Sequence, residues 1–191
     1  MHGIQAVLTN PLYLLFSCER TLCGTPVSSM NPYRRIFGSL NDAGVRYIIV
    51  GGVAMNLLGY PRFTGDIDIL LALDKKNLSK MAGLMKKMHY EKRIPASIEE
   101  LGDEKKVLAL MKEKNLLAYT FANPAEPQFS IDVIVGNSLQ FDDYEKRSSR
   151  MPVWDIKIPV ISIDDLIGMK KKTKRRKDDE DVAMLLTLKG L

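Results

Sequence analysis

Residues 50–68 read VGGVAMNLLGYPRFTGDID, a stretch in which two glycines end one apolar run and two aspartates enter another. The β-branched run at 45–50 predicts a buried strand that the glycines stop, and residues 54–58 predict a short helix. A second strand is predicted over 65–73. Because side chains alternate along a strand, Asp66 and Asp68 project from one face. Two carboxylates this close repel unless a cation neutralises them, so the pattern predicts a divalent metal such as magnesium.

A third carboxylate is expected, because magnesium prefers several oxygen ligands. The strand predicted at residues 129–135 supplies a candidate. Asp132 is the only charge in this apolar run and lies on the face opposite Ile131 and Val133. The glycines fit the same site, because a turn without side chains at Gly51 and Gly52 lets a phosphate approach backbone N–H groups at a helix start. Order and spacing together predict a nucleotide site with a metal.

The remaining chain alternates helical and strand patterns, which predicts an α+β fold. Residues 1–29 carry almost no charge and no sustained periodicity, so they are expected to be an N-terminal extension, dispensable for activity, before one domain at 30–191. Helices are predicted from Pro32 to about Gly44, around 78–88, over 97–112, around Tyr144, from Ser162 and around residues 182–186, with further strands at 116–121 and a strand or hairpin at 152–160.

Composition narrows the class of protein. The chain has 191 residues, 46% of them hydrophobic, which is enough for one sizeable core. Its apolar runs are strand-sized, so no membrane span is expected. Cys18 and Cys23 form neither a disulfide framework nor a zinc pattern, which favours a cytoplasmic protein. The net charge of +5 is local: residues 170–177, KKKTKRRK, hold seven basic side chains, so the rest is slightly acidic. This cluster suggests a phosphate-facing edge or a tRNA-sized footprint, or else a solvated helix end.

The glycine turn and three aspartates resemble the nucleotidyltransferase superfamily with a polymerase-beta-like core. That superfamily carries a Gly-Gly or Gly-Ser turn, then D-h-D on the next strand, then an aspartate on a later strand. From Met30 onward the chain is similar to small AbiEii-like bacterial nucleotidyltransferases of toxin-antitoxin systems. These share the RxTxDID pattern, here beginning with Arg62 and Thr64, and a late DDLIxxK helix, here ending at Lys170. The resemblance implies a mixed β-sheet core flanked by helices.

The resemblance also implies an activity and roles for residues. A hydroxyl attacks the α-phosphorus of a nucleoside triphosphate such as ATP, and pyrophosphate leaves. Two metal ions, Mg²⁺ or Mn²⁺, would clamp the attacking and leaving oxygens. The implied metal ligands and catalytic residues are Asp66, Asp68 and Asp132, and the implied nucleotide-binding residues are Gly51, Gly52, Arg62, Thr64, Lys170 and Lys177. Lys170 is open to a second interpretation as a surface lysine with a buried stem. Lys177 and Asp181 are expected to form a structural pair.

Three functions remain open from the sequence. The first is a metal-dependent nucleotidyltransferase that modifies a hydroxyl on tRNA or on a partner protein, either alone or as one half of a toxin-antitoxin pair. The second is a weakly active or inactive antitoxin of the same fold that neutralises a toxin by binding it. The third is an RNA-binding module that uses the basic run. Intact acidic residues at all three positions favour the enzyme.

Overall fold

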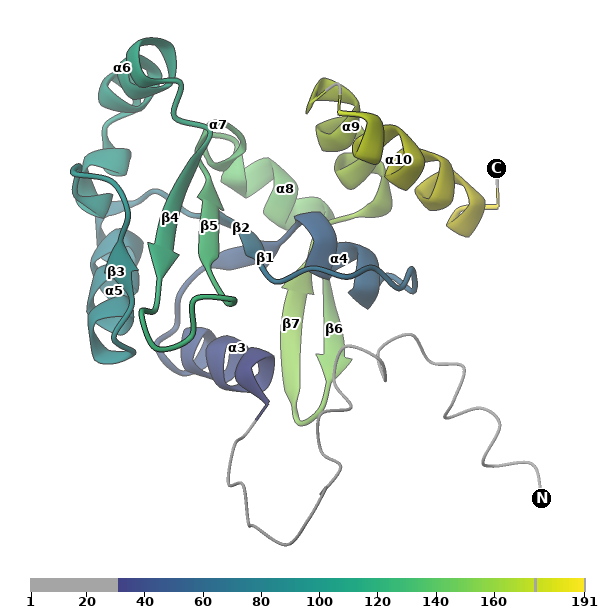
Figure 1. Cartoon of the computed structure of the whole chain (residues 1–191), viewed down its shortest axis with the longest axis horizontal. Helices are drawn as coiled ribbons and strands as arrows, with labels where there is room; N and C mark the ends of the chain where they lie inside the picture. The colour runs from purple at the N-terminus through teal and green to yellow at the C-terminus, as the bar shows by residue number, and fades with distance from the viewer. Residues whose placement is uncertain (1–30, 174, 191) are drawn as a thin grey trace, which may run out of the picture.

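The computed structural model describes residues 31–173 and 175–190. The predicted N-terminal extension and both cysteines lie outside these residues. Seven strands form one sheet: β1 (Tyr47–Ile49), β2 (Ile67–Leu71), β3 (Glu91–Lys92), β4 (Ala118–Ala122), β5 (Ile131–Ile134), β6 (Ser149–Val153) and β7 (Ile156–Val160). Their order across the sheet is β3-β4-β5-β2-β1-β7-β6 (Figure 1). The β1–β7 and β2–β5 pairs are parallel and the other pairs are antiparallel, which confirms the predicted mixed sheet in an α+β fold.

Helices surround this sheet. They are α3 (Pro32–Asp42), α4 (Gly51–Leu57), α5 (Lys75–Lys87), the 3₁₀ helix η1 (Ile98–Gly102), α6 (Glu104–Lys114), α7 (Val135–Ser138), α8 (Phe141–Arg147), α9 (Ile163–Thr173) and α10 (Arg176–Leu188). The last two pack against each other at one side of the molecule (Figure 1). No helix among the described residues is long and apolar enough to cross a membrane.

Local sequence explains where α3 begins. The side chain of Asn31 accepts a hydrogen bond from the backbone N–H of Tyr33 at 3.0 Å, and Pro32 occupies the first helical position. Both features favour a helix start. The periodic residues Ile36, Phe37 and Leu40 are fully buried, which confirms the predicted helix and its inward face.

Three predicted boundaries were wrong. Helix α4 begins at Gly51 itself, and Asp66 precedes β2 instead of lying inside it. The predicted helix over 97–112 is interrupted, because the Asp103 side chain accepts hydrogen bonds from the N–H groups of Lys105 and Lys106 and so starts a new helix. The hairpin at the end of the sheet is confirmed, with Trp154 at positive φ in its turn.

The register of the central strands positions the polar residues. Asp68 on β2 pairs directly with Asp132 on β5, and the flanking pairs Ile67–Ile131 and Ile69–Val133 are fully buried. Alternation therefore sends the apolar side chains into the core and both carboxylates to the opposite face. Only long-range strand pairing brings these two segments together.

Candidate active site

Three carboxylates lie at the start of β2 and β5. Asp68 and Asp132 are cross-strand neighbours, so strand pairing brings together two of the three carboxylates that were expected to share a metal. Asp66 lies two residues before Asp68, just ahead of β2. Its Oδ1 accepts a hydrogen bond from the Ser130 hydroxyl at 2.6 Å. The structure thus brings Asp68 and Asp132 side by side and holds Asp66 next to them through Ser130.

The surroundings of Asp68 and Asp132 oppose the ionisation of these two carboxyl groups. Burial raises the pKa of Asp68 to about 6, and the charges of Asp132 and Asp66 add to the rise. The Gly52 N–H and the Lys170 ammonium offset only part of it. Burial also raises the pKa of Asp132, with a further contribution from Asp66. Negative charge therefore accumulates here without matching positive charge.

A divalent cation fits this donor set. Within residues 31–173 and 175–190, no three His, Cys, Asp or Glu side chains are already grouped tightly enough to hold a metal ion. However, Oδ1 of Asp132 is buried and has no hydrogen-bond partner among the described residues. An orphaned carboxylate oxygen is costly unless something binds it. Carboxylate oxygens on a rigid sheet are the donors that magnesium and manganese prefer, so the chemistry of the residues suits such an ion.

The glycine turn is shaped by Asp68 as well as by any ligand. Gly51 has a φ of +61°, and a Cβ at this position would overlap the Asp68 carboxylate. A Cβ on Gly52 would come within 2.8 Å of Thr64 Cβ and Oγ1. Both positions therefore require glycine for close packing. The sequence interpretation, which attributed the glycines to phosphate approach alone, missed this second reason.

A cavity of about 210 Å³ adjoins the turn and the carboxylate of Asp68. It is smaller than a typical whole-ligand pocket. Its polar lining includes Gly51, Gly52, Arg62, Asp68, Asn137, Lys170, Thr173, Arg175 and Asp178. Four of the six predicted nucleotide-binding residues are in this lining; Thr64 and Lys177 are not.

Comparison with known proteins identifies the family. Residues 36–187 match the family described as nucleotidyl transferase AbiEii toxin, type IV TA system. The chain belongs to this AbiEii family. Among curated protein sequences, none matches significantly.

Solved structures share the fold of this AbiEii-family nucleotidyltransferase. A lincosamide antibiotic adenylyltransferase, LnuA, with lincomycin bound, is 16% identical, with a TM-score of 0.56 over 84% of this chain and 98% of its own. A nucleotidyltransferase-like protein from Paracoccidioides brasiliensis is 17% identical, with a TM-score of 0.51 over 81% of this chain and 72% of its own. A putative nucleotidyltransferase from Thermotoga maritima is 16% identical, with a TM-score of 0.50 over 81% and 90%. At these identities the similarity establishes the fold alone.

Lys170 of the AbiEii-family chain is a buried cation. Its Nζ donates hydrogen bonds to Oδ2 of Asp181 at 2.6 Å and to Oδ1 of Asp178 at 3.2 Å. Arg62, from the loop before β2, pairs with the same oxygen of Asp181. Lys170 is buried, so its interpretation as a surface lysine was wrong. The expected pairing of Lys177 with Asp181 was also wrong, because Asp181 pairs with Arg62 and Lys170 while Lys177 is exposed.

The loop that carries Arg62 and Thr64 is tied down by residues that the sequence interpretation did not select. The Asn56 side-chain amide donates to the carbonyl oxygens of Gly52 and Arg62, at 3.2 and 2.8 Å. The Tyr33 hydroxyl donates to the Thr64 carbonyl oxygen at 2.9 Å. A polar residue inside the apolar helix was the only available signal for Asn56. Ser130 was detectable, because it shares the strand face of Asp132.

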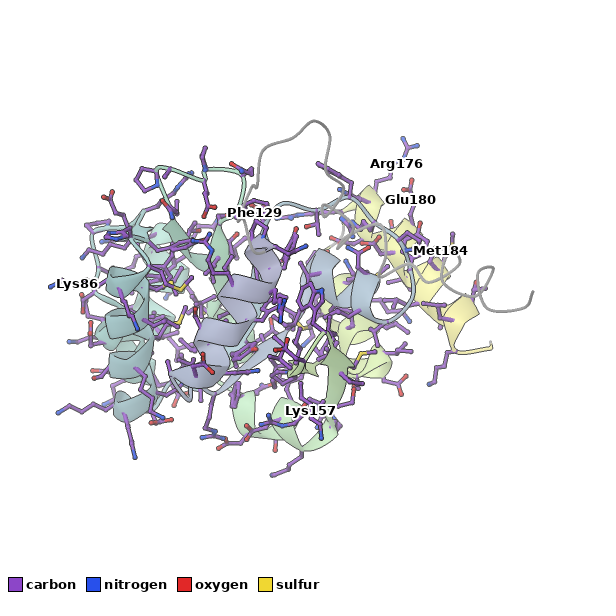
Figure 2. The ribbon with its side chains drawn as sticks, turned by 90° about the horizontal axis from the view of Figure 1, so that it is seen from below. Lys86, Phe129, Lys157, Arg176, Glu180 and Met184 are labelled. Carbon is purple, nitrogen blue, oxygen red and sulfur yellow. The ribbon has the colours of Figure 1, made fainter. Side chains whose placement is uncertain are left out.

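Replacing Asp181 with alanine is expected to destabilise the protein by about 3–5 kcal/mol, because it leaves two largely buried cations without their shared carboxylate. Denaturant unfolding measures this change. Glu180→Ala is the matched control: Glu180 is exposed on the outer side of α10, where Arg176 is its one ion-pair partner in the described part of the chain (Figure 2). Equal stabilities for the two variants would contradict a structural role for the Asp181 network.

Proposed function

We propose that this AbiEii-family nucleotidyltransferase is metal-dependent and transfers a nucleoside monophosphate from a nucleoside triphosphate to a hydroxyl on tRNA or on a partner protein. The observation that carries the proposal is the pair Asp68 and Asp132. They are in register on adjacent strands, both with raised pKa values, and Asp68 borders a cavity that also contains Lys170. Because the family is described as a toxin of a type IV system, we place the protein in a toxin-antitoxin pair.

The proposed roles follow from these positions. Asp66, Asp68 and Asp132 hold Mg²⁺ or Mn²⁺, which when bound neutralises triphosphate charge and activates the reacting oxygens. Oδ1 of Asp132 has no other partner among the described residues and takes the proton of the attacking hydroxyl.

The cavity side of the proposed site binds the triphosphate. The N–H groups at Gly51 and Gly52 and the cations of Arg62 and Lys170 contact its oxygens, on a loop that Thr64 helps to pack. Lys177 contributes positive charge from the exposed surface of α10. The proposed nucleotidyltransferase domain comprises residues 30–191, with 1–29 dispensable for its activity.

Incubating the purified chain with magnesium, one α-phosphate-labelled triphosphate at a time, tRNA and total protein tests this proposal. We expect label on a single class of acceptor, release of pyrophosphate, and loss of both when EDTA removes the metal. Transfer that persists in EDTA would contradict metal dependence, and no labelled acceptor with any triphosphate would contradict the transferase. A binding module would instead show salt-dependent RNA affinity that is indifferent to substitution of Asp66 or Asp68.

A further inference from the structure

One face of the β4–β5 half of the sheet is less buried than the other among the described residues. On these two strands the side chains of Tyr119, Phe121, Ile131 and Val133 are buried in the core, whereas Thr120 and Asp132 between them are only half-buried. Among the described residues this face is therefore the more accessible side of the two strands, although Oδ1 of Asp132 is itself buried.

Arg93, Thr120, Asp132 and Asp68 form a row across four neighbouring strands. The Arg93 N–H donates to the Thr120 carbonyl oxygen at 3.0 Å, which continues the β3–β4 ladder by one residue. Thr120 pairs with Asp132, and Asp132 pairs with Asp68. Residues paired across a sheet place their side chains on the same face, about 5 Å apart per strand. Arg93 thus lies about two strand spacings from Asp132.

A cationic side chain lies on each side of the carboxylates in the row. Arg93 is exposed and forms no ion pair with an acidic side chain in the described part of the chain, so its guanidinium is available to a ligand. It is nevertheless near enough to lower the pKa of Asp132, as does the Thr120 hydroxyl. At the other end of the row Asp68 borders the cavity that contains Lys170. The carboxylates therefore have one cationic group, Lys170, on the cavity side and another, Arg93, at the opposite end of the row.

We propose that Arg93 and Thr120 form the acceptor subsite, and that the acceptor carries a phosphate next to its attacking hydroxyl. This inference rests on the proposed function. The guanidinium of Arg93 binds the phosphate through two parallel N–H donors, and the Thr120 hydroxyl orients the acceptor over Asp132. Arginine suits this task because its planar fork matches phosphate oxygens. A phosphate would otherwise be repelled by the three carboxylates.

The acceptor and the triphosphate approach the carboxylates from opposite ends of the row. The acceptor oxygen arrives from the Arg93 side and forms a bond to the α-phosphorus of the triphosphate on the cavity side. The bond from that phosphorus to the pyrophosphate oxygen breaks, and pyrophosphate leaves with the electron pair. The hydroxyl proton passes to Asp132. A serine, threonine or tyrosine hydroxyl in a protein carries no adjacent phosphate and gains nothing from Arg93.

A binding experiment tests the subsite without requiring turnover. Fluorescence anisotropy with a short labelled single-stranded RNA that has a free 3′-hydroxyl gives the Kd for the full chain in magnesium. Arg93→Gln is expected to raise the Kd about tenfold or more, the loss of a charge-assisted contact. Arg93→Lys should recover much of the affinity. For Arg93→Gln, the Kd should depend less steeply on salt concentration, by about the contribution of one phosphate contact.

Lys92→Gln is the matched control. Lys92 is the adjacent exposed cation, but its ammonium donates hydrogen bonds to the carbonyl oxygens of Pro95 and Ala96. Its Kd should match that of the unaltered chain. Competition by ribose 5-phosphate would assign the phosphate site to small phosphorylated acceptors, and failure to compete would assign it to the RNA backbone. Equal Kd values for Arg93→Gln and Lys92→Gln, or no binding of either probe, would overturn the subsite.

Kinetics separate this proposal from the proposed function. In the label-transfer assay, Arg93→Gln should raise the KM for the acceptor and leave the KM for the triphosphate unchanged. Absence of transfer by the unaltered chain would reject the proposed function, while the binding measurement would still decide the subsite. Transfer to a protein acceptor with Arg93→Gln fully active would overturn the subsite alone.

Discussion

Asp68→Asn is expected to lower nucleotidyl transfer by about a thousandfold or more and, at the same time, to make the metal-free protein more stable at pH 8. The activity loss follows because asparagine cannot supply the negative oxygen that binds the metal, a contribution worth about 4 kcal/mol or more of transition-state stabilisation. Transfer rates with saturating triphosphate and magnesium measure it. Retained activity would contradict the proposed role of Asp68.

The raised pKa of Asp68 is the reason why the Asp68→Asn variant should be more stable at pH 8. The pKa of Asp68 is about 6 in the folded protein, against 3.8 for an unperturbed aspartate such as that of the unfolded chain. The carboxyl group therefore holds its proton more tightly in the folded protein. The stability of the metal-free protein therefore falls as pH rises from about 4 to about 6, and the full penalty persists above that. Two pKa units correspond to about 2–3 kcal/mol. Asp68→Asn should remove this penalty at pH 8 and give no advantage below pH 4.

Chemical unfolding in EDTA at pH 4, 6 and 8 measures the effect. Asp143→Asn is a suitable control, because its carboxylate is exposed on α8 outside the site. A variant that loses stability together with activity would indicate that Asp68 supports the fold instead of the chemistry. Opposite signs for the two effects are the signature of a residue retained for function.

Gly51→Ala is expected to reduce activity by about a hundredfold or more and to destabilise the protein by about 1–3 kcal/mol. Its φ of +61° costs an L-residue about 1–2 kcal/mol, and the added methyl group overlaps the Asp68 carboxylate. The Asp68 carboxylate must then move away from Gly51, and misplacing a reacting group by about 1 Å costs about a hundredfold.

Gly38→Ala provides the control for glycine replacement as such. Gly38 lies inside α3 with nothing within 4 Å of an added Cβ, so alanine should stabilise the helix by about 0.5–1 kcal/mol without affecting transfer. Thermal unfolding and the labelling assay on both variants give the comparison. A fully active Gly51→Ala protein would show that the close packing against Asp68 is not needed for catalysis.

Much of the sheet was predictable because its signals are local. The alternation in residues 65–73 and 129–135 identified both central strands and placed Asp68 and Asp132 on their polar faces. Spacing along the chain could not give the partner of Arg62, because Asp181 is 119 residues away and reaches it only when α9 and α10 pack beside the loop. The same limit hid Arg93, which joins the row through strand pairing and carries no local signature.

The Asp181 contact spans most of the described chain and links the loop before β2 to the final helix. Ribosomes that stop before α10 would therefore release products in which Arg62 and Lys170 have lost their shared carboxylate. Such fragments would also lack Asp178, which lines the cavity proposed to bind the triphosphate. We therefore expect nucleotidyl transfer only from chains that include α10.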